Sequence, residues 1–83
     1  MNLEVLTPEK RLYSGEVTGV KLPGTAGSFE ILNNHAPLIS SLEKGEMRIK
    51  AASGDTTIAI EDGFVECLKN TIVVLVGGGE VKA

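Results

Sequence analysis

The chain has 83 residues, of which 42% are hydrophobic and 23% charged, so its length and composition predict one ordinary globular domain. Its net charge is −3 and its eight Lys and Arg residues are scattered, which argues against binding to nucleic acid. One cysteine, Cys67, and one histidine, His35, exclude an internal disulfide and a metal site built on clustered Cys and His. No cofactor is expected.

The amino-terminal residues lack the basic start and long apolar run of a secretory signal. No stretch approaches the roughly 18 apolar residues of a membrane span. We therefore expect a protein on the cytosolic side of a membrane.

Apolar and polar residues alternate with a period of two in short runs bounded by Gly, Pro, Asn or Asp, a pattern typical of half-buried strands. Strands are predicted at residues 2–7, 10–14, 16–22, 28–32, 36–42, 46–51, 56–60, 64–68 and 71–76. Leu38 and Ile39 are expected to be buried, and 71–76, the most apolar run, to lie centrally with both faces covered. The small residues of 23–27 predict an exposed loop that reaches a partner.

These elements predict an all-β fold, a flattened β-sandwich or barrel of two antiparallel sheets with about nine or ten short strands. The sandwich domain is expected over residues 1–76. Because consecutive glycines are costly to order, residues 77–83 are expected to form a flexible tail.

Few residues suggest chemistry. His35 has no evident Ser or Cys nucleophile with a third orienting group, so a structural or interface role is favoured over catalysis. Glu61 and Asp62 precede Gly63 and are interpreted as turn formers rather than as an acid/base pair.

Two further features have plain structural interpretations. Residues 73–79 lack the Gly-Lys-Ser/Thr ending of a phosphate-binding loop, so nucleotide binding is not expected there. Cys67 shares a strand face with Val65 and is expected to be a buried, unreactive side chain.

The segment GSFEILNNHAPL, residues 27–38, resembles the signature of the epsilon subunits of F-type ATP synthases. The segments LEVLTP at 3–8, GEMRI at 45–49 and GFVE at 63–66 lie in the order of that family. Because their joint order and spacing extend over almost the whole chain, the resemblance is specific.

The resemblance implies a non-catalytic rotor subunit that docks on the gamma subunit and touches the ring of c subunits. In that family, ion flow turns the ring, and gamma and epsilon turn with it, so that the catalytic sites on the alpha and beta subunits respond. The implied location is peripheral, on the cytoplasmic face of the bacterial inner membrane, with membrane contact only through the complex. Longer members continue into two helices that inhibit ATP hydrolysis, and some bind ATP there; because this sequence stops at Ala83, autoinhibition by that route is not expected.

The resemblance also implies two contact segments. The candidate gamma-facing residues are His35, Ala36, Pro37 and Leu38. The candidate residues for the c-ring are Gly24, Thr25, Gly27, Ser28 and Glu30. Because an exposed ion pair contributes only about 0–1 kcal/mol, shape is expected to matter more than the acidic charge at the ring.

Two other classes stay open on the residues alone. A lipoyl or biotinyl carrier is also a small β-sandwich, but it needs a modifiable lysine on a tight hairpin, and the turns at 53–55 and 61–63 have none. A small enzyme is the third alternative, and the lack of a convergent nucleophile, base or metal set makes it the weakest.

Overall fold

The computed structural model describes residues 1–82, which form ten strands and no helix. The strands are β1 (Asn2–Leu6), β2 (Arg11–Glu16), β3 (Gly19–Gly24), β4 (Gly27–Leu32), β5 (Leu38–Leu42), β6 (Gly45–Lys50), β7 (Thr56–Ile60), β8 (Gly63–Leu68), β9 (Thr71–Val76) and β10 (Gly79–Lys82). Accordingly, none of these residues belongs to a helix long and apolar enough to cross a membrane. The predicted all-β fold is confirmed.

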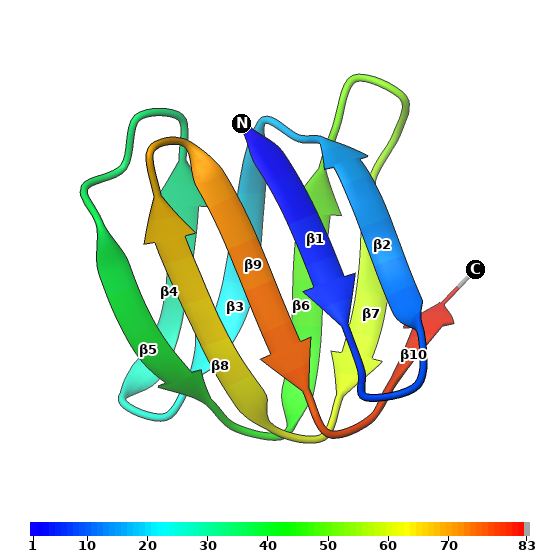
Figure 1. Ribbon diagram of the computed structural model, residues 1–83. Helices are drawn as coiled ribbons and strands as arrows, with labels where there is room; N and C mark the ends of the chain where they lie inside the picture. The colour runs from blue at the N-terminus through cyan, green and yellow to red at the C-terminus, as the bar shows by residue number, and fades with distance from the viewer. Residues whose placement is uncertain (83) are drawn as a thin grey trace.

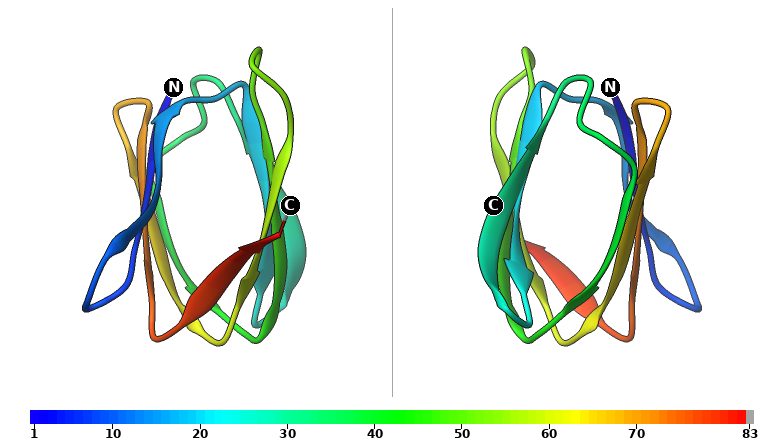
Figure 2. Two further views of the ribbon diagram at one scale, coloured as in Figure 1. Left: turned by 90° about the vertical axis from the view of Figure 1, so that its right-hand side faces the viewer. Right: turned by 90° about the vertical axis from the view of Figure 1, so that its left-hand side faces the viewer.

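The strands lie in two facing layers (Figures 1 and 2). One layer has the order β4-β3-β6-β7-β10 and the other β5-β8-β9-β1-β2. A single residue pair, Gly24 opposite Leu42, joins β3 to β5, so the layers form a flattened and nearly closed barrel. Among the described strands, every pairing is antiparallel except that of β1 with β9, which is parallel. The N-terminal strand therefore adds one parallel pair to the sheets that were expected to be antiparallel.

The core lies between the layers and is entirely apolar in the described part of the chain. Alternate residues of each strand point inward, as a period of two requires. Fully buried side chains include Leu3, Val5, Val20, Leu22, Met47, Ile49, Ile58, Val65, Ile72 and Val74. Cys67 is buried beside them, as predicted, and burial raises the pKa of its thiol. Burial of these alternate side chains, with no disulfide, holds the two layers together.

The C-terminal segment differs from the flexible tail expected over residues 77–83. Residues 79–82 form β10, which pairs with β7 from Gly79 opposite Ile60 to Lys82 opposite Thr57. Because β7 bonds to β6 on its other side, its outer edge has backbone groups that a further strand can satisfy. The tail prediction is thus corrected over residues 79–82, and Ala83 lies outside the described residues.

Gly63 allows β8 and β9 to approach closely where β8 begins. It lies opposite Val76 of β9, and a Cβ atom at this position would overlap the carbonyl oxygen of Leu75. Gly63→Ala should therefore shift the backbone and destabilise the fold by about 3 kcal/mol. Thermal unfolding followed by circular dichroism should show a midpoint lower by roughly 12 °C or more.

Gly15→Ala is the matched control, because Gly15 also lies within a strand. A Cβ atom at this position would have its nearest neighbour 3.9 Å away, in the ring of Tyr13. This variant should unfold within a few degrees of the wild type. Equal melting of the two variants would contradict the close approach at Gly63.

Candidate docking surfaces

The outer faces of the two layers differ in chemistry. On the layer that contains β3 and β6, the outward side chains include Lys21, Glu46, Arg48 and Lys50. Lys50 lies 3.5 Å from the Glu30 carboxylate of β4. This face is mainly polar and solvated, as is usual for the outside of a sandwich, although Leu32 at the end of β4 is also exposed, at 54%.

A second ion pair on the same layer joins Glu46 of β6 to Lys82 of β10. The hydrogen bond from Lys82, and then its charge, hold the pKa of the Glu46 carboxyl below its ordinary value, and the same contacts raise the pKa of Lys82. Both groups are exposed to solvent, so the pair adds little to stability. It does connect the last strand to the middle of the layer.

The outer face of β5, β8 and β9 is mostly apolar instead, and its one exposed charge is Glu66, which lies between Ile39 of β5 and Val73 of β9. Relative exposure is 75% for Ile39, 61% for Phe64 and 53% for Leu75. Phe64 lies opposite Leu75 in the pairing of β8 with β9, so their side chains stand together on the same side of the sheet. We call the set of Ile39, Phe64, Leu68, Val73 and Leu75 the apolar face.

A recess lies at one end of the apolar face, where β1 and β9 end and β8 begins, which is the lower end of the molecule in Figure 1. A cavity of about 550 Å³ opens there, lined by Pro8, Leu42, Phe64 and Leu75 among others. Pro8 belongs to the turn between β1 and β2, which leans away from the layer in Figure 2. A projecting apolar group of another molecule would therefore find both a flat surface and a recess.

The predicted gamma-facing residues lie in and after the connection between β4 and β5. His35, Ala36 and Pro37 are exposed, whereas Leu38 is half-buried and packs against the core. The His35 ring nitrogen Nδ1 lies 2.7 Å from the carbonyl oxygen of Ala36. Within residues 1–82, no three His, Cys, Asp or Glu side chains gather as metal ligands would. A shallow hollow that Pro37 shares with Ile39 and Leu68 makes this connection continuous with the apolar face.

The predicted c-ring residues lie at the opposite end of the sandwich (Figure 1). Residues 23–27 form a tight hairpin between β3 and β4 rather than a loop, and only Thr25 and Ala26 lie outside the strands. Gly27 supplies the positive φ of 126° that the turn requires. The Thr25 hydroxyl is 2.8 Å from that of Ser41 on β5. The tip is thus exposed but tied to the neighbouring strand.

Two of the predicted c-ring residues, Gly24 and Glu30, are not free contact residues at the exposed tip of the hairpin. Gly24 is buried, because it pairs with Leu42 where the layers join, so it is not a surface contact residue. Glu30 is exposed, but its carboxylate already faces Lys50. Thr25, Gly27 and Ser28 are exposed at or beside the tip. The structure does not bring the two predicted contact segments together.

Comparisons with known proteins identify the family. The description "ATP synthase, Delta/Epsilon chain, beta-sandwich domain" belongs to a family profile that matches residues 1–81. The chain belongs to this family. The resemblance predicted from residues 27–38 is thereby confirmed.

Individual relatives agree with the assignment. The chain is 42% identical over 82 residues to the ATP synthase epsilon chain of Leptospira borgpetersenii, covering 99% of this chain and 65% of the relative. It is 41% identical over 81 residues to the epsilon chain of Synechocystis sp., and the match covers 98% of this chain and 60% of that relative. The chain thus spans less than two thirds of the length of these curated relatives.

Solved structures show the same fold. A chain in the Euglena gracilis mitochondrial ATP synthase, described as OSCP/F1/c-ring, is similar with a TM-score of 0.88 at 13% identity, covering 95% of this chain and 51% of that one. A chain from the central stalk and c-ring of the Tetrahymena thermophila mitochondrial ATP synthase is similar with a TM-score of 0.79 at 19% identity. The match covers 95% of this chain and 64% of that one. Both similarities show that this chain has the same β-sandwich fold as the two solved chains.

Sequence reasoning missed the apolar face of this epsilon-type domain. Ile39 was expected to be buried but is the most exposed of the large apolar residues. Residues 71–76 do lie centrally, between β8 and β1, yet residues 1–82 bury only one of their faces and leave Leu75 exposed on the other. The signal was available in TIVVLV, since apolar residues stand at every position of β9 after Thr71.

Because the apolar face contributes nothing to the core, its loss should not unfold the domain. Ile39→Thr/Phe64→Thr keeps β-forming residues at both positions and should change the free energy of unfolding by no more than about 0.5 kcal/mol per site. Urea denaturation measures this directly. Binding of a hydrophobic dye to the folded chain should fall in parallel.

The contrasting control for this test is Val74→Ala on β9 of the same layer. Val74 is fully buried, and removal of its methyl groups should cost about 2 kcal/mol or more. If the double threonine variant is as unstable as Val74→Ala, the apolar face is part of the core and not a free surface.

Proposed function

We propose that this chain is a non-catalytic subunit of the rotor of an F-type ATP synthase, which binds the gamma subunit through the apolar face. The observation that carries the proposal is the contrast between the two outer faces. A sandwich that works alone has polar residues outside both layers, whereas here Ile39, Phe64 and Leu75 are presented together to the surroundings. Large exposed apolar patches of this kind mark interaction sites.

The dimensions of the domain suit such an interface. The molecule measures 28 × 27 × 21 Å, so one broad face approaches the roughly 800 Å² that each partner buries in a stable complex. Phe64, which stands opposite Leu75 with the recess beside it, has the features of an interface anchor. Exposed His35 and Pro37 extend this surface beyond the end of the sheet.

The proposed second partner is the c-ring, reached by the β3–β4 hairpin. The β3–β4 hairpin lies at the other end of the domain from the connection between β4 and β5 (Figure 1), so the chain can touch two partners without either blocking the other. The ties from Thr25 to Ser41 stiffen the hairpin, as transmission of torque requires. In this proposal, ion flow turns the ring, and the chain passes the rotation to gamma.

Location follows from the partners. A chain held between gamma and the ring is peripheral and lies on the side of the membrane where ATP is made. For a bacterial enzyme this is the cytoplasmic face of the inner membrane. In this proposal the chemistry of ATP synthesis belongs to other subunits, and the surface features described serve docking.

One structural observation bears on the carrier alternative. Lys69 is exposed in the tight turn between β8 and β9, so the chain does present a lysine on a hairpin. The apolar face beside it has no role in a carrier that must move freely. An intact mass equal to that of the unmodified sequence, measured on protein from its native source, would exclude the carrier role.

The proposal is tested by binding to the purified gamma subunit from the same organism. Wild-type chain should co-elute with gamma as a 1:1 complex in size-exclusion chromatography. Ile39→Thr/Phe64→Thr should weaken the affinity, measured by calorimetry, at least about 30-fold, as loss of a central anchor does.

Val81→Thr is the matched control, since Val81 is also an exposed apolar residue, with 45% relative exposure, but lies on β10 in the other layer. It should bind gamma as the wild type does. Separate elution of folded wild-type chain and folded gamma would overturn the proposal, and equal weakening by both substitutions would overturn the choice of face.

A further inference from the structure

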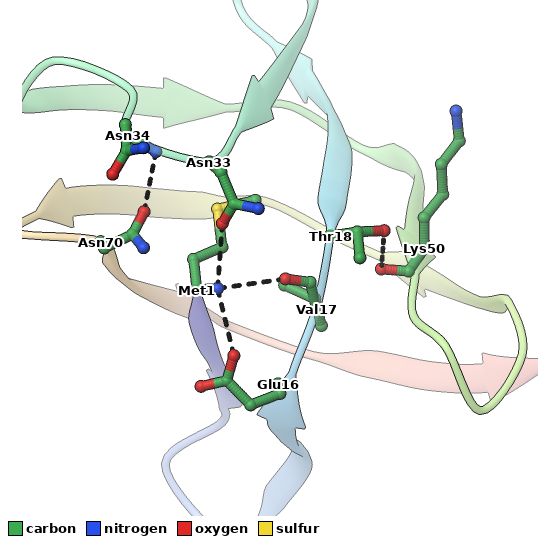
Figure 3. A network of polar contacts seen from close by, with 8 residues as sticks. All are labelled: Met1, Glu16, Val17, Thr18, Asn33, Asn34, Lys50 and Asn70. Carbon is green, nitrogen blue, oxygen red and sulfur yellow. Dashed lines mark hydrogen bonds and ion pairs between the residues drawn. The ribbon is translucent and has the colours of Figure 1, made fainter.

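The connection between β4 and β5 is exposed yet held at defined points (Figure 3). The backbone N–H of Asn34 donates a hydrogen bond to the side-chain oxygen of Asn70, at 2.9 Å. The side-chain oxygen of Asn33 accepts a hydrogen bond from the amino group of Met1, at 3.1 Å. Residues 33–37 are all exposed, so no buried side chain of their own fixes them.

Asn70 is itself fixed from two directions. It lies in the β8–β9 turn with a positive φ of 62°, which asparagine adopts more readily than most residues. Its carbonyl oxygen accepts a hydrogen bond from the backbone N–H of Asn2 at 3.0 Å, so β1 holds the turn in place. The side chain that reaches Asn34 therefore starts from a rigid position.

A glycine would satisfy the turn equally well, because it adopts positive φ without strain. Only the side-chain oxygen of Asn70 can accept the hydrogen bond from Asn34, across 36 positions of sequence. The contact thus links the β8–β9 turn to the connection that carries His35 and Pro37. The contact therefore joins the end of β8, a strand that carries part of the apolar face, to the β4–β5 connection, which continues this face.

We propose that Asn70 is a positioning residue for docking: it holds residues 33–37 in the conformation in which His35 and Pro37 meet gamma together with the apolar face. This inference rests on the function proposed above. A connection released from this hydrogen bond would spend part of its time in other conformations, and the apparent affinity falls by the fraction that stays competent. One ordinary hydrogen bond shifts that population about fivefold.

The test uses three variants of the full chain. Asn70→Gly removes the acceptor and keeps the turn, whereas Asn70→Asp keeps an oxygen acceptor at the same place. Lys69→Gly is the matched control, because Lys69 also has a positive φ, of 50°, in the same turn, and its side chain makes no hydrogen bond within residues 1–82. Both glycine variants carry the same added freedom in the unfolded chain.

Two quantities are measured for each variant, with the thermal midpoint as a check on folding. The ¹⁵N order parameters of the Asn34 and His35 amides should fall from about 0.85 to below about 0.6 in Asn70→Gly only. The affinity for gamma should weaken about fivefold in Asn70→Gly. Asn70→Asp should restore both, and the midpoint of Asn70→Gly should lie no more than about 8 °C below that of Lys69→Gly, as expected for the loss of one hydrogen bond from a chain that stays folded.

Unchanged order parameters in Asn70→Gly would overturn the inference. So would a loss of order with unchanged affinity for gamma, since the contact would then serve stability alone. A wild-type chain that fails to bind gamma would overturn the proposed function and the docking role with it; the order parameters would still show whether Asn70 holds the connection. If the wild type binds gamma and Asn70→Gly binds equally well, the proposed function stands and only this inference is rejected.

Discussion

The inward alternation of apolar side chains is the constraint on which the rest of the structure depends. The buried residues, Leu3, Val20, Met47, Val65 and Ile72 among them, come from strands of both layers, and nothing polar is buried with them within residues 1–82. A slip of one residue in any strand would turn its buried set outward, so the core fixes the register. Because the register is fixed, the alternate side chains of β5, β8 and β9 that do not enter the core must point outward. An apolar face is the consequence, and no part of residues 1–82 covers it.

Much of the fold could be predicted because period-two burial is local information. Strands 56–60 and 71–76 match the structure residue for residue. The same reasoning does not work where two apolar residues are adjacent, because the sequence does not show which of the two side chains points inward. At Leu38 and Ile39, it is Leu38 that packs against the core. The C-terminal strand was missed for another reason. Its pairing depends on the free edge of β7 rather than on its own glycine-rich residues.

The candidate site was harder to predict than the fold. The apolar face collects residues from three strands that are distant in sequence, so no continuous motif marks it. The segment around His35 could be found by family resemblance, but its anchor, Asn70, lies 36 positions from Asn34 and is brought near by the pairing of β5 with β8, which sets Leu38 opposite Cys67. Gly24 was expected in an exposed loop because a run of small residues resembles one, whereas it is buried in β3 where the two layers meet.

The most direct measurement of the central claim is the solvent accessibility of methyl groups, read by NMR with a soluble paramagnetic agent, for the chain alone and in complex with gamma. The account predicts that the methyl signals of Ile39 and Leu75 are strongly broadened in the free chain and protected in the complex, while those of Val81 stay broadened in both. Protection of Val81 with continued broadening of Ile39 and Leu75 would show that gamma binds the other layer and would contradict the account.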